Sequence, residues 1–387
     1  MDATTPQSGY RLPIRFVGSG SEYFRIWIVN LLLTLVTLGL YYPFAKVRRL
    51  RYFHGATEVG GDPLSFHGDP WKMLRGYLLV AALVVAYSLA GWFSPAAGAI
   101  AFVAVAALWP ALWQLSLKFR LANTGWRGLR FGFTGSRGGA YLAWLPLALP
   151  GVLFGALVLL LAPAQRGAAA AEPAVAGILL IAALPLVMLL ALPAQLWWLK
   201  RYQQRHYRLG GEKSRFEVGL GAAYGLALRL FGMSMLFGLL LAIGVALFTT
   251  LLRGAFETHQ PPDGPPVAAL LSAALVFVLL QATWGAYLLS RLQNLVWNRT
   301  RSEHLHFESR LTFRRLAPLT LRNWLLTIAT LGLYLPFAQV ATARLRLESV
   351  TALSATDPAL LLQHAGGGAD DASGDAAADL LGIDLGL

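Results

Sequence analysis

Six long apolar runs, separated by short polar connections, occupy the middle of this chain. They lie at residues 76–93, 96–117, 140–162, 174–199, 223–251 and 267–290. A helix needs about 20 apolar residues to cross the roughly 30 Å hydrocarbon layer of a membrane, and each run is near or above that length. The pattern therefore predicts transmembrane helices.

The connections divide these runs into three pairs by their charge. Within the pairs, the only basic residues in the connections are Arg166 and Arg253, whereas the loops between pairs carry several lysines or arginines each. Lysine and arginine are enriched in the cytoplasmic loops of membrane proteins. We therefore expect three helical hairpins that start and end at the cytoplasmic side, with both termini in the cytoplasm.

Two shorter apolar segments flank the six runs and repeat each other. Residues 24–51 and 320–346 share the pattern T-x-x-T-L-G-L-Y-x-P-F-A and end in basic residues. Each copy is interrupted by glycine and proline. In membrane transporters, a matched pair of interrupted segments indicates the discontinuous helices that form the binding site. The repeat is therefore the first place to look for a functional site.

The apolar parts of the two copies, residues 26–45 and 324–338, have two interpretations. By length, the first copy is long enough to span the membrane. Basic residues at both ends of each copy instead favour entry and exit on one side. Pro43 would clash with the carbonyl group of Gly39, which gives a break in the helix a cause. We therefore predict interrupted, re-entrant segments, with spanning helices as the alternative.

Short stretches of alternating polar and apolar residues precede the apolar segments. They lie at residues 15–18, 65–68, 130–135, 215–219 and 304–309, and most of them end in glycine. Alternation with aromatic residues and a final glycine predicts a short strand that ends in a turn. We expect these strands to form small β elements at the cytoplasmic face of the helix bundle.

Composition places the chain in the membrane class. Hydrophobic residues make up 56% of it and charged residues 13%, whereas soluble proteins carry about 25% charged residues. We predict an all-α polytopic membrane protein with short cytoplasmic strands, in which residues 1–350 form a single membrane domain. Residues 351–387, an acidic tail rich in glycine and alanine, should be disordered. The net charge of +13 lies in the loops, so we expect no nucleic-acid partner.

The repeated segment also carries a family resemblance. The sequence YFRIWIVNLLLTLVTLGLYYPFAKVRRLRYF at residues 23–53, with FVG before it and FHG at 66–68 after it, resembles the YjgN-like bacterial inner-membrane proteins. The resemblance covers the chain to about residue 350. It implies a multi-pass protein of the bacterial inner membrane and no particular reaction, because the family is a domain of unknown function. Members are often thought to be encoded near membrane metallopeptidases, so the resemblance implies a metallopeptidase partner.

Polar side chains in both copies lie at helical spacing. Asparagine, two threonines and tyrosine follow one another at intervals of 4, 3 and 4 residues, which places them on one helix face. They either line a polar pathway, with the glycines allowing close backbone approach, or hold helices together as small polar residues commonly do in membranes. The candidate pathway residues are Asn30, Thr34, Thr37, Gly39, Tyr41, Pro43, Asn323, Thr327, Thr330, Gly332, Tyr334 and Pro336.

A second group of candidates combines basic and aromatic residues. Tryptophan and tyrosine favour the membrane interface, and lysine and arginine there meet anionic headgroups. The candidate headgroup contacts are Lys46, Arg48, Arg49, Arg51, Lys200 and Arg201. In the second copy Gln339 and Ala341 replace Lys46 and Arg48, so the two copies need not have the same function.

Catalytic and metal-binding patterns are absent from the sequence. There is no cysteine, no hydrolase or nucleotide-binding motif, and no zinc-ligand spacing. We expect no enzyme activity, cofactor or metal. The first hypothesis is a channel-like or transporter-like protein for a small polar or lipidic substrate. The alternative is a non-transporting scaffold or partner-binding protein, such as one associated with a membrane metallopeptidase.

Overall fold

A computed structural model describes residues 10–165, 175–256 and 275–357. The chain divides into two compact units, of which the first comprises residues 1–65 and 225–358 and the second residues 66–224 together with the tail. Each unit is described by itself below. The prediction of a single domain over residues 1–350 stays a prediction.

Strands of the first unit form an antiparallel sheet. In spatial order they are β3 (Asp62–Phe66), β2 (Thr57–Val59), β1 (Tyr10–Phe16), β11 (Val350–Ser354), β10 (Leu305–Ser309) and β9 (Thr300–Arg301). Side chains along β1 alternate: Leu12 and Phe16 are buried, whereas Arg11 and Arg15 are exposed. The chain ends of the unit therefore meet in the sheet, where β1 pairs with β11.

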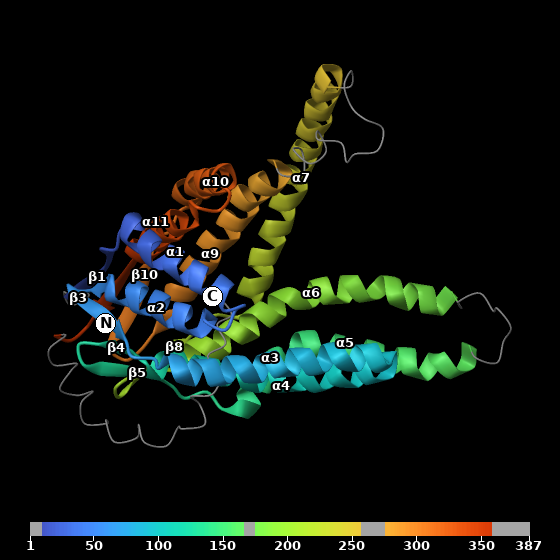
Figure 1. Cartoon of the computed structure of the whole chain (residues 1–387), viewed down its shortest axis with the longest axis horizontal. Helices are drawn as coiled ribbons and strands as arrows, with labels where there is room; N and C mark the ends of the chain where they lie inside the picture. Colours follow the sequence, from blue (N-terminus) through green and yellow to red (C-terminus); the bar gives the residue numbers. More distant parts are fainter. Residues whose placement is uncertain (1–9, 166–174, 257–274, 358–387) are drawn as a thin grey trace, which may run out of the picture. The chain divides into compact units, whose positions relative to one another are not determined.

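Two helical hairpins rise from this sheet. In the first hairpin, α1 (Gly20–Val36) and α2 (Tyr42–Gly55) are joined by residues 37–41; in the second, α10 (Phe313–Ala329) and α11 (Leu335–Glu348) are joined by residues 330–334. Each hairpin returns to the strand it left. The amide of Val17 donates to the carbonyl of Ala56, and the amide of Arg310 to that of Ser349, both at 2.9 Å. The two repeated segments are therefore interrupted hairpins, labelled in Figure 1.

The predicted cause of the interruption is wrong. The chain turns at Leu38 and Gly39, with φ angles of 49° and 92°, and Pro43 lies in the first turn of α2. A proline there loses no helical hydrogen bond and has no preceding turn to clash with. Pro336 has the same place at the start of α11. The prolines start the second helices rather than breaking the first ones.

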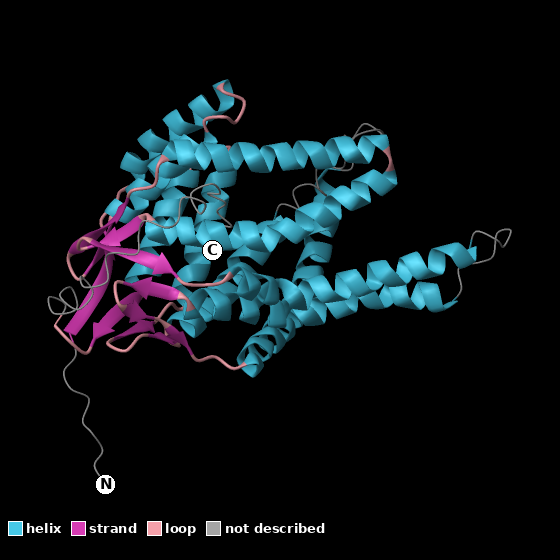
Figure 2. Cartoon of the chain, turned by 90° about the horizontal axis from the view of Figure 1, so that it is seen from below, coloured by secondary structure: helices cyan, strands magenta, loops and turns pink. Residues whose placement is uncertain are grey.

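The second unit contains longer helices on the same kind of strand. Its elements are α3 (Pro70–Phe93), α4 (Pro95–Ala122), β4 (Thr124–Trp126), β5 (Leu129–Phe133), α5 (Arg137–Gln165), α6 (Val175–Arg205), β6 (Tyr207–Leu209), β7 (Glu212–Lys213) and β8 (Arg215–Phe216). Helix α3 packs on α4, α4 on α5, and α5 on α6. Strand β5 pairs antiparallel with β4 and β6. Helices therefore leave from the ends of short strands, drawn in magenta in Figure 2.

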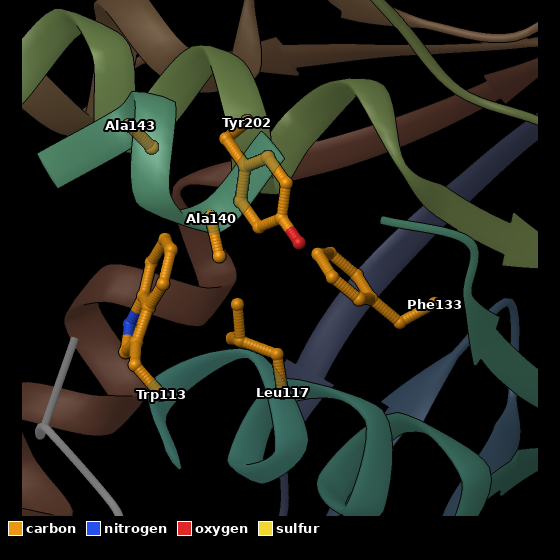
Figure 3. Packing of buried hydrophobic residues seen from close by; sticks show 6 residues of the cluster. All are labelled: Trp113, Leu117, Phe133, Ala140, Ala143 and Tyr202. Carbon is orange, nitrogen blue, oxygen red and sulfur yellow. The ribbon is translucent and has the colours of Figure 1, made fainter. Parts of the chain in front are cut away.

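A small aromatic core holds these helices to β5. Figure 3 shows Trp113, Leu117, Phe133 and Tyr202 pointing toward one another around Ala140. The hydroxyl group of Tyr202 donates to the carbonyl of Ser136 at 2.7 Å, so the ring is fixed at its polar end as well. The core therefore lies where the strand ends and the helices begin.

The remaining elements are α7 (Leu220–Phe256), which carries the boundary between the units, and a π-helix, η1 (Gln281–Gly285), that leads into α9 (Ala286–Trp297). Five helices of the described residues are long and apolar enough to cross a membrane; they begin at residues 70, 96, 182, 220 and 275. This confirms a polytopic membrane protein. The predicted run 140–162 lies within α5, which is outside those five.

Two parts of the predicted fold need correction. The described residues contain eleven strands, so the class all-α is wrong, although all the predicted stretches contain or adjoin a strand. The tail boundary at residue 351 is also too early, because residues 350–354 form β11 between β1 and β10. The strand has the alternating sequence VTALS, which the sequence-based boundary assigned to the glycine-rich tail. Residues 358–387 of the predicted tail lie outside the described residues.

A buried glutamine links α5 and α6. Gln195 donates from Nε2 to the carbonyl of Ala143 at 2.9 Å, and its Oε1 accepts from the amide of Leu147 at 3.1 Å. The two backbone groups are four residues apart in α5, on either side of Pro146, at positions that normally bond to each other in a helix. The glutamine therefore satisfies helix backbone beside a proline.

We expect Gln195→Leu to lower the free energy of unfolding by about 1–3 kcal/mol, because buried backbone groups lose their partner. Thermal or denaturant unfolding of the purified protein in detergent measures this. Ser88→Ala is the matched control, since the Ser88 hydroxyl is exposed and bonds only to its own helix at Val84. Equal stability of the two variants would contradict the role assigned to Gln195.

Candidate functional site

The predicted polar stripe begins at a buried asparagine in each hairpin. Asn30 and Asn323 are 7% and 6% exposed. Nδ2 of Asn323 donates to the carbonyl of Ala338 at 3.3 Å and to the hydroxyl of Thr342 at 3.2 Å, which ties α10 to α11. Oδ1 of each asparagine and the hydroxyl of Tyr41 have no hydrogen-bond partner among the described residues. Most buried polar atoms in proteins have a hydrogen-bond partner, which can be an ordered water molecule.

The threonines of the stripe bond within their own hairpins. Thr34 donates to the carbonyl of Asn30, and Thr37 to that of Leu33, both at 2.7 Å, and the Thr37 hydroxyl also accepts from the amide of Tyr41 at 2.9 Å. The second hairpin repeats these bonds with the same lengths at Thr327, Thr330 and Tyr334. The hydroxyls therefore have a structural role, and a role in a pathway stays a prediction.

The glycines of the stripe serve the turn. Gly39 and Gly332 both have φ angles of 92°, which favour glycine because it lacks a Cβ. A Cβ at Gly332 would meet nothing within 4 Å, so the expected close approach of another backbone is wrong at this position. The sequence correctly indicated an unusual backbone conformation at these glycines. The reason for glycine at Gly332 is the positive φ angle of the turn and not the approach of another backbone.

The two hairpins pack against each other through α1 and α11. The hydroxyl of Tyr23 donates to Oε1 of Gln339 at 3.2 Å, and the rings of Phe24 and Phe337 lie 5.6 Å apart. A Cβ at Gly20 would lie 2.5 Å from the Phe337 ring, so the helices approach closely there. The exchange of lysine for glutamine between the copies therefore places an acceptor opposite Tyr23.

A second set of bonds fixes α11 to the end of β1. Arg344 donates from Nε to the carbonyl of Phe16 at 3.3 Å and from Nη2 to that of Gly18 at 2.7 Å. Arg344 is therefore held at the base of the hairpins, next to the sheet.

The candidate headgroup contacts have different surroundings. Lys46 is buried, which argues against a direct headgroup contact for this residue. Arg48 lies over the ring of Tyr41 and Arg49 over that of Phe53, at 5.6 and 6.0 Å from the ring centres. Arg51 is exposed.

In the second unit, Arg201 lies 4.8 Å from the ring centre of Trp197, and Lys200 donates to Gln203 at 3.2 Å. A guanidinium group stacked on an aromatic ring is attracted by the electrons of the ring face. Contact of these residues with lipid stays a prediction.

A basic cavity at the base of the second hairpin was not found from the sequence. It has a volume of about 340 Å³ and lies between β1, β10, β11 and the near ends of α10 and α11. Its charged lining residues are Arg11, Glu308, Arg310, Arg315 and Glu348. Glu308 forms an ion pair with Arg310 at 3.0 Å. Within the described part of the chain, the side chains of Arg11 and Arg315 show no hydrogen bond or ion pair.

In the first hairpin, side chains of the hairpin itself occupy the helix start. The hydroxyl of Ser19 accepts from the amide of Glu22 at 3.2 Å. The hydroxyl of Tyr52 donates to the carbonyl of Ser19 at 2.8 Å and to the Glu22 carboxylate at 3.3 Å. Burial and the Glu22 charge raise the pKa of Tyr52 to about 12, so this hydroxyl remains a donor.

The second hairpin carries different residues at the matching positions. Thr312, Arg315 and Leu345 stand where the first copy has Ser19, Glu22 and Tyr52. Helix α10 begins without a side-chain cap and with arginine in place of the acid. A gap-free alignment of the two copies extended to the preceding strand would have revealed this exchange of charge.

Comparison with known proteins gives a family and relatives. The family described as "Bacterial protein of unknown function (DUF898)" matches residues 11–380. An inner membrane protein YjgN of Salmonella typhimurium is 33% identical over 147 residues, 38% of this chain and 37% of the relative. The protein of the same name from Escherichia coli K12 is 28% identical over 141 residues, 35% and 34% of the two chains. The alignments thus span about a third of these relatives. No solved structure matches.

We expect Thr37→Val and Thr330→Val each to lower the free energy of unfolding by about 1–2 kcal/mol, because the amide of Tyr41 or Tyr334 loses its acceptor. Unfolding in detergent measures the change. Thr37→Ser and Thr330→Ser keep the hydroxyl and should retain most of the stability. Unchanged stability in the valine variants would show that these hydroxyls do not hold the turns together.

Proposed function

The chain belongs to the DUF898 family of bacterial proteins, and from that premise we propose that it is a transporter-like membrane protein for a small polar or lipidic substrate with an anionic group. The observation that carries the proposal is the basic cavity beside the second hairpin. The proposal assigns no catalytic step and no cofactor.

The charges of the cavity favour an anion. Arginines outnumber carboxylates by three to two among its lining residues, and Glu308 is already paired with Arg310. The remaining charged groups are Arg11, Arg315 and Glu348, whose carboxylate accepts from the amide of Phe16 at 3.4 Å, so an excess of positive charge is left for a ligand. Guanidinium groups bind phosphate and carboxylate oxygens through two parallel hydrogen bonds, which makes a phosphate-bearing ligand the best match.

The helix start adds to the same preference. The first amide groups of a helix carry a partial positive charge, and an acid such as Glu22 normally compensates it. At α10 the corresponding residue is Arg315, which adds positive charge instead. An anion bound in the cavity would replace the missing acid.

The size and surroundings of the cavity favour a headgroup. A volume of about 340 Å³ is at the lower end of the range for small-molecule sites, which suits a headgroup better than a whole lipid. Exposed apolar side chains continue along α10 at Leu325 and Ile328. A lipidic substrate could therefore place its acyl chains along the hairpin while its headgroup occupies the cavity.

The buried, unpaired atoms of Asn30, Asn323 and Tyr41 support a polar route within the hairpins, as the sequence predicted. Opposed to this is the observation that the threonine hydroxyls are already bonded within the hairpins. That observation favours the second candidate, a non-transporting scaffold that binds a membrane protein such as a metallopeptidase. Release of a phosphate-bearing solute or lipid from sealed vesicles by the reconstituted protein separates the two.

We expect Arg11→Gln combined with Arg315→Gln to weaken binding of a phosphate-bearing ligand at least tenfold, because each charged hydrogen bond contributes roughly 1.5–3 kcal/mol. The measurement is binding of inorganic phosphate, and separately of phosphatidic acid in phosphatidylcholine nanodiscs, to the full chain. Weaker binding of the lipid alone would assign the site to a headgroup, and weaker binding of both to any phosphate.

The matched control is Arg137→Gln, which removes an exposed arginine from the first turn of α5, where Ser136 already caps the helix by accepting from Gly139. An equal loss of binding in the control variant, or no loss in the cavity variant, would contradict the proposed site.

A further inference from the structure

The outermost residue of each hairpin is a leucine in an unusual conformation. Leu38 and Leu331 have φ angles of 49° and 50°, in the left-handed region. This conformation is sterically unfavourable for leucine, whereas glycine and asparagine adopt it readily. Both side chains are 94% exposed, so no contact with the described protein offsets the strain. The same combination occurs twice in one chain.

The turns around these leucines leave no amide group for water. In the first hairpin the amides of residues 37–42 all donate within the hairpin, including Gly39 to the carbonyl of Thr34 at 2.8 Å. In the second hairpin the amides of residues 330–335 do the same, with Gly332 bonded to Thr327 at 2.7 Å. The amides of a loop in water can bond to the solvent, whereas amides in hydrocarbon need partners within the protein.

The residues beside the tips are apolar and exposed. Val36 is 81% exposed, and Leu35 and Leu40 are exposed as well. The second tip exposes Ile328 and Leu333 in the same way. Exposed apolar surface that ends a charge-free segment is suited to acyl chains rather than to water.

The distance from the tips to the nearest charges fits half a membrane. Leu38 is eight residues from Lys46, and Leu331 is nine residues from Arg322, which corresponds to about 12 and 14 Å along a helix. The hydrocarbon layer is about 30 Å thick, so its centre lies about 15 Å from either interface. Helices α1 and α11, of 17 and 14 residues, reach about 25 and 21 Å, too short to cross.

We propose that both hairpins enter the membrane from one side and end near its centre, with Leu38 and Leu331 against lipid acyl chains. The strained leucines are the contact surface, and the bonded turns allow them to lie in hydrocarbon. This inference stands on the membrane location of the family and is independent of the proposed substrate and of the basic cavity.

The chain has no cysteine, so single substitutions can carry a spin label without background. The test places the label at Leu38→Cys and Leu331→Cys in the full chain, reconstituted in phosphatidylcholine bilayers. Collision with oxygen and with a water-soluble nickel complex gives the depth of each label. Val84→Cys, an exposed position midway along α3, and Glu303→Cys, an exposed position between β9 and β10, are the references.

We expect both tip labels to collide with oxygen as the Val84→Cys label does and to be protected from the nickel complex. Labels that collide with the nickel complex as Glu303→Cys does would place the tips in water, on either side of the membrane, and overturn the proposal. Immobile labels protected from both reagents would assign the tips to a protein partner and overturn it as well.

A stability measurement gives an independent check. Leu38→Gly combined with Leu331→Gly should leave the melting temperature in detergent unchanged or raise it, since glycine relieves the backbone strain and no packing is lost. A clear fall in melting temperature would show that protein contacts hold the leucines, and would contradict the assignment to lipid.

Discussion

The architecture depends on keeping the backbone amide groups bonded where the chain reverses direction. A helix end leaves amide and carbonyl groups without partners, and water is scarce inside a membrane. The threonine hydroxyls at the two turns meet this requirement by donating to the preceding helix and accepting from the next one. At the opposite end, Val17 and Arg310 close each hairpin onto the carbonyl where its second helix ends.

The same closing bond recurs in the second unit around longer helices. The amide of Thr134 donates to the carbonyl of His206 at 2.9 Å, just as Val17 donates to Ala56. Tyr202 donates to Ser136 as Tyr52 donates to Ser19. One local device, a strand end bonded to a helix end, therefore supports both short hairpins and long apolar ones.

The two short hairpins show how one scaffold acquires different surfaces. Their turns agree in bond lengths and in backbone angles, because any change there would leave an amide unpaired. Their bases, which lie near the sheet, have no such constraint. There the second copy exchanges an acid for Arg315 and a tyrosine for Leu345, and a cavity lined by arginines lies at the changed base. The repeat thus separates a turn that is the same in both copies from a base whose side chains differ between them.

The sequence by itself determined the elements that depend on local patterns. Apolar runs set the long helices, alternating residues before glycine set the strands, and the matching T-x-x-T-L-G-L-Y segments set the two interrupted hairpins, because each is a consequence of nearby residues. Only the tertiary structure decided that the break lies at Leu38 and Gly39 rather than at Pro43, that β11 extends the ordered chain past residue 350, and that Arg11 and Arg315 line one cavity. Arg11 and Arg315 are about three hundred residues apart in sequence, and strand pairing between β1 and β11 brings them together. Such pairing depends on the whole fold, which no local pattern encodes.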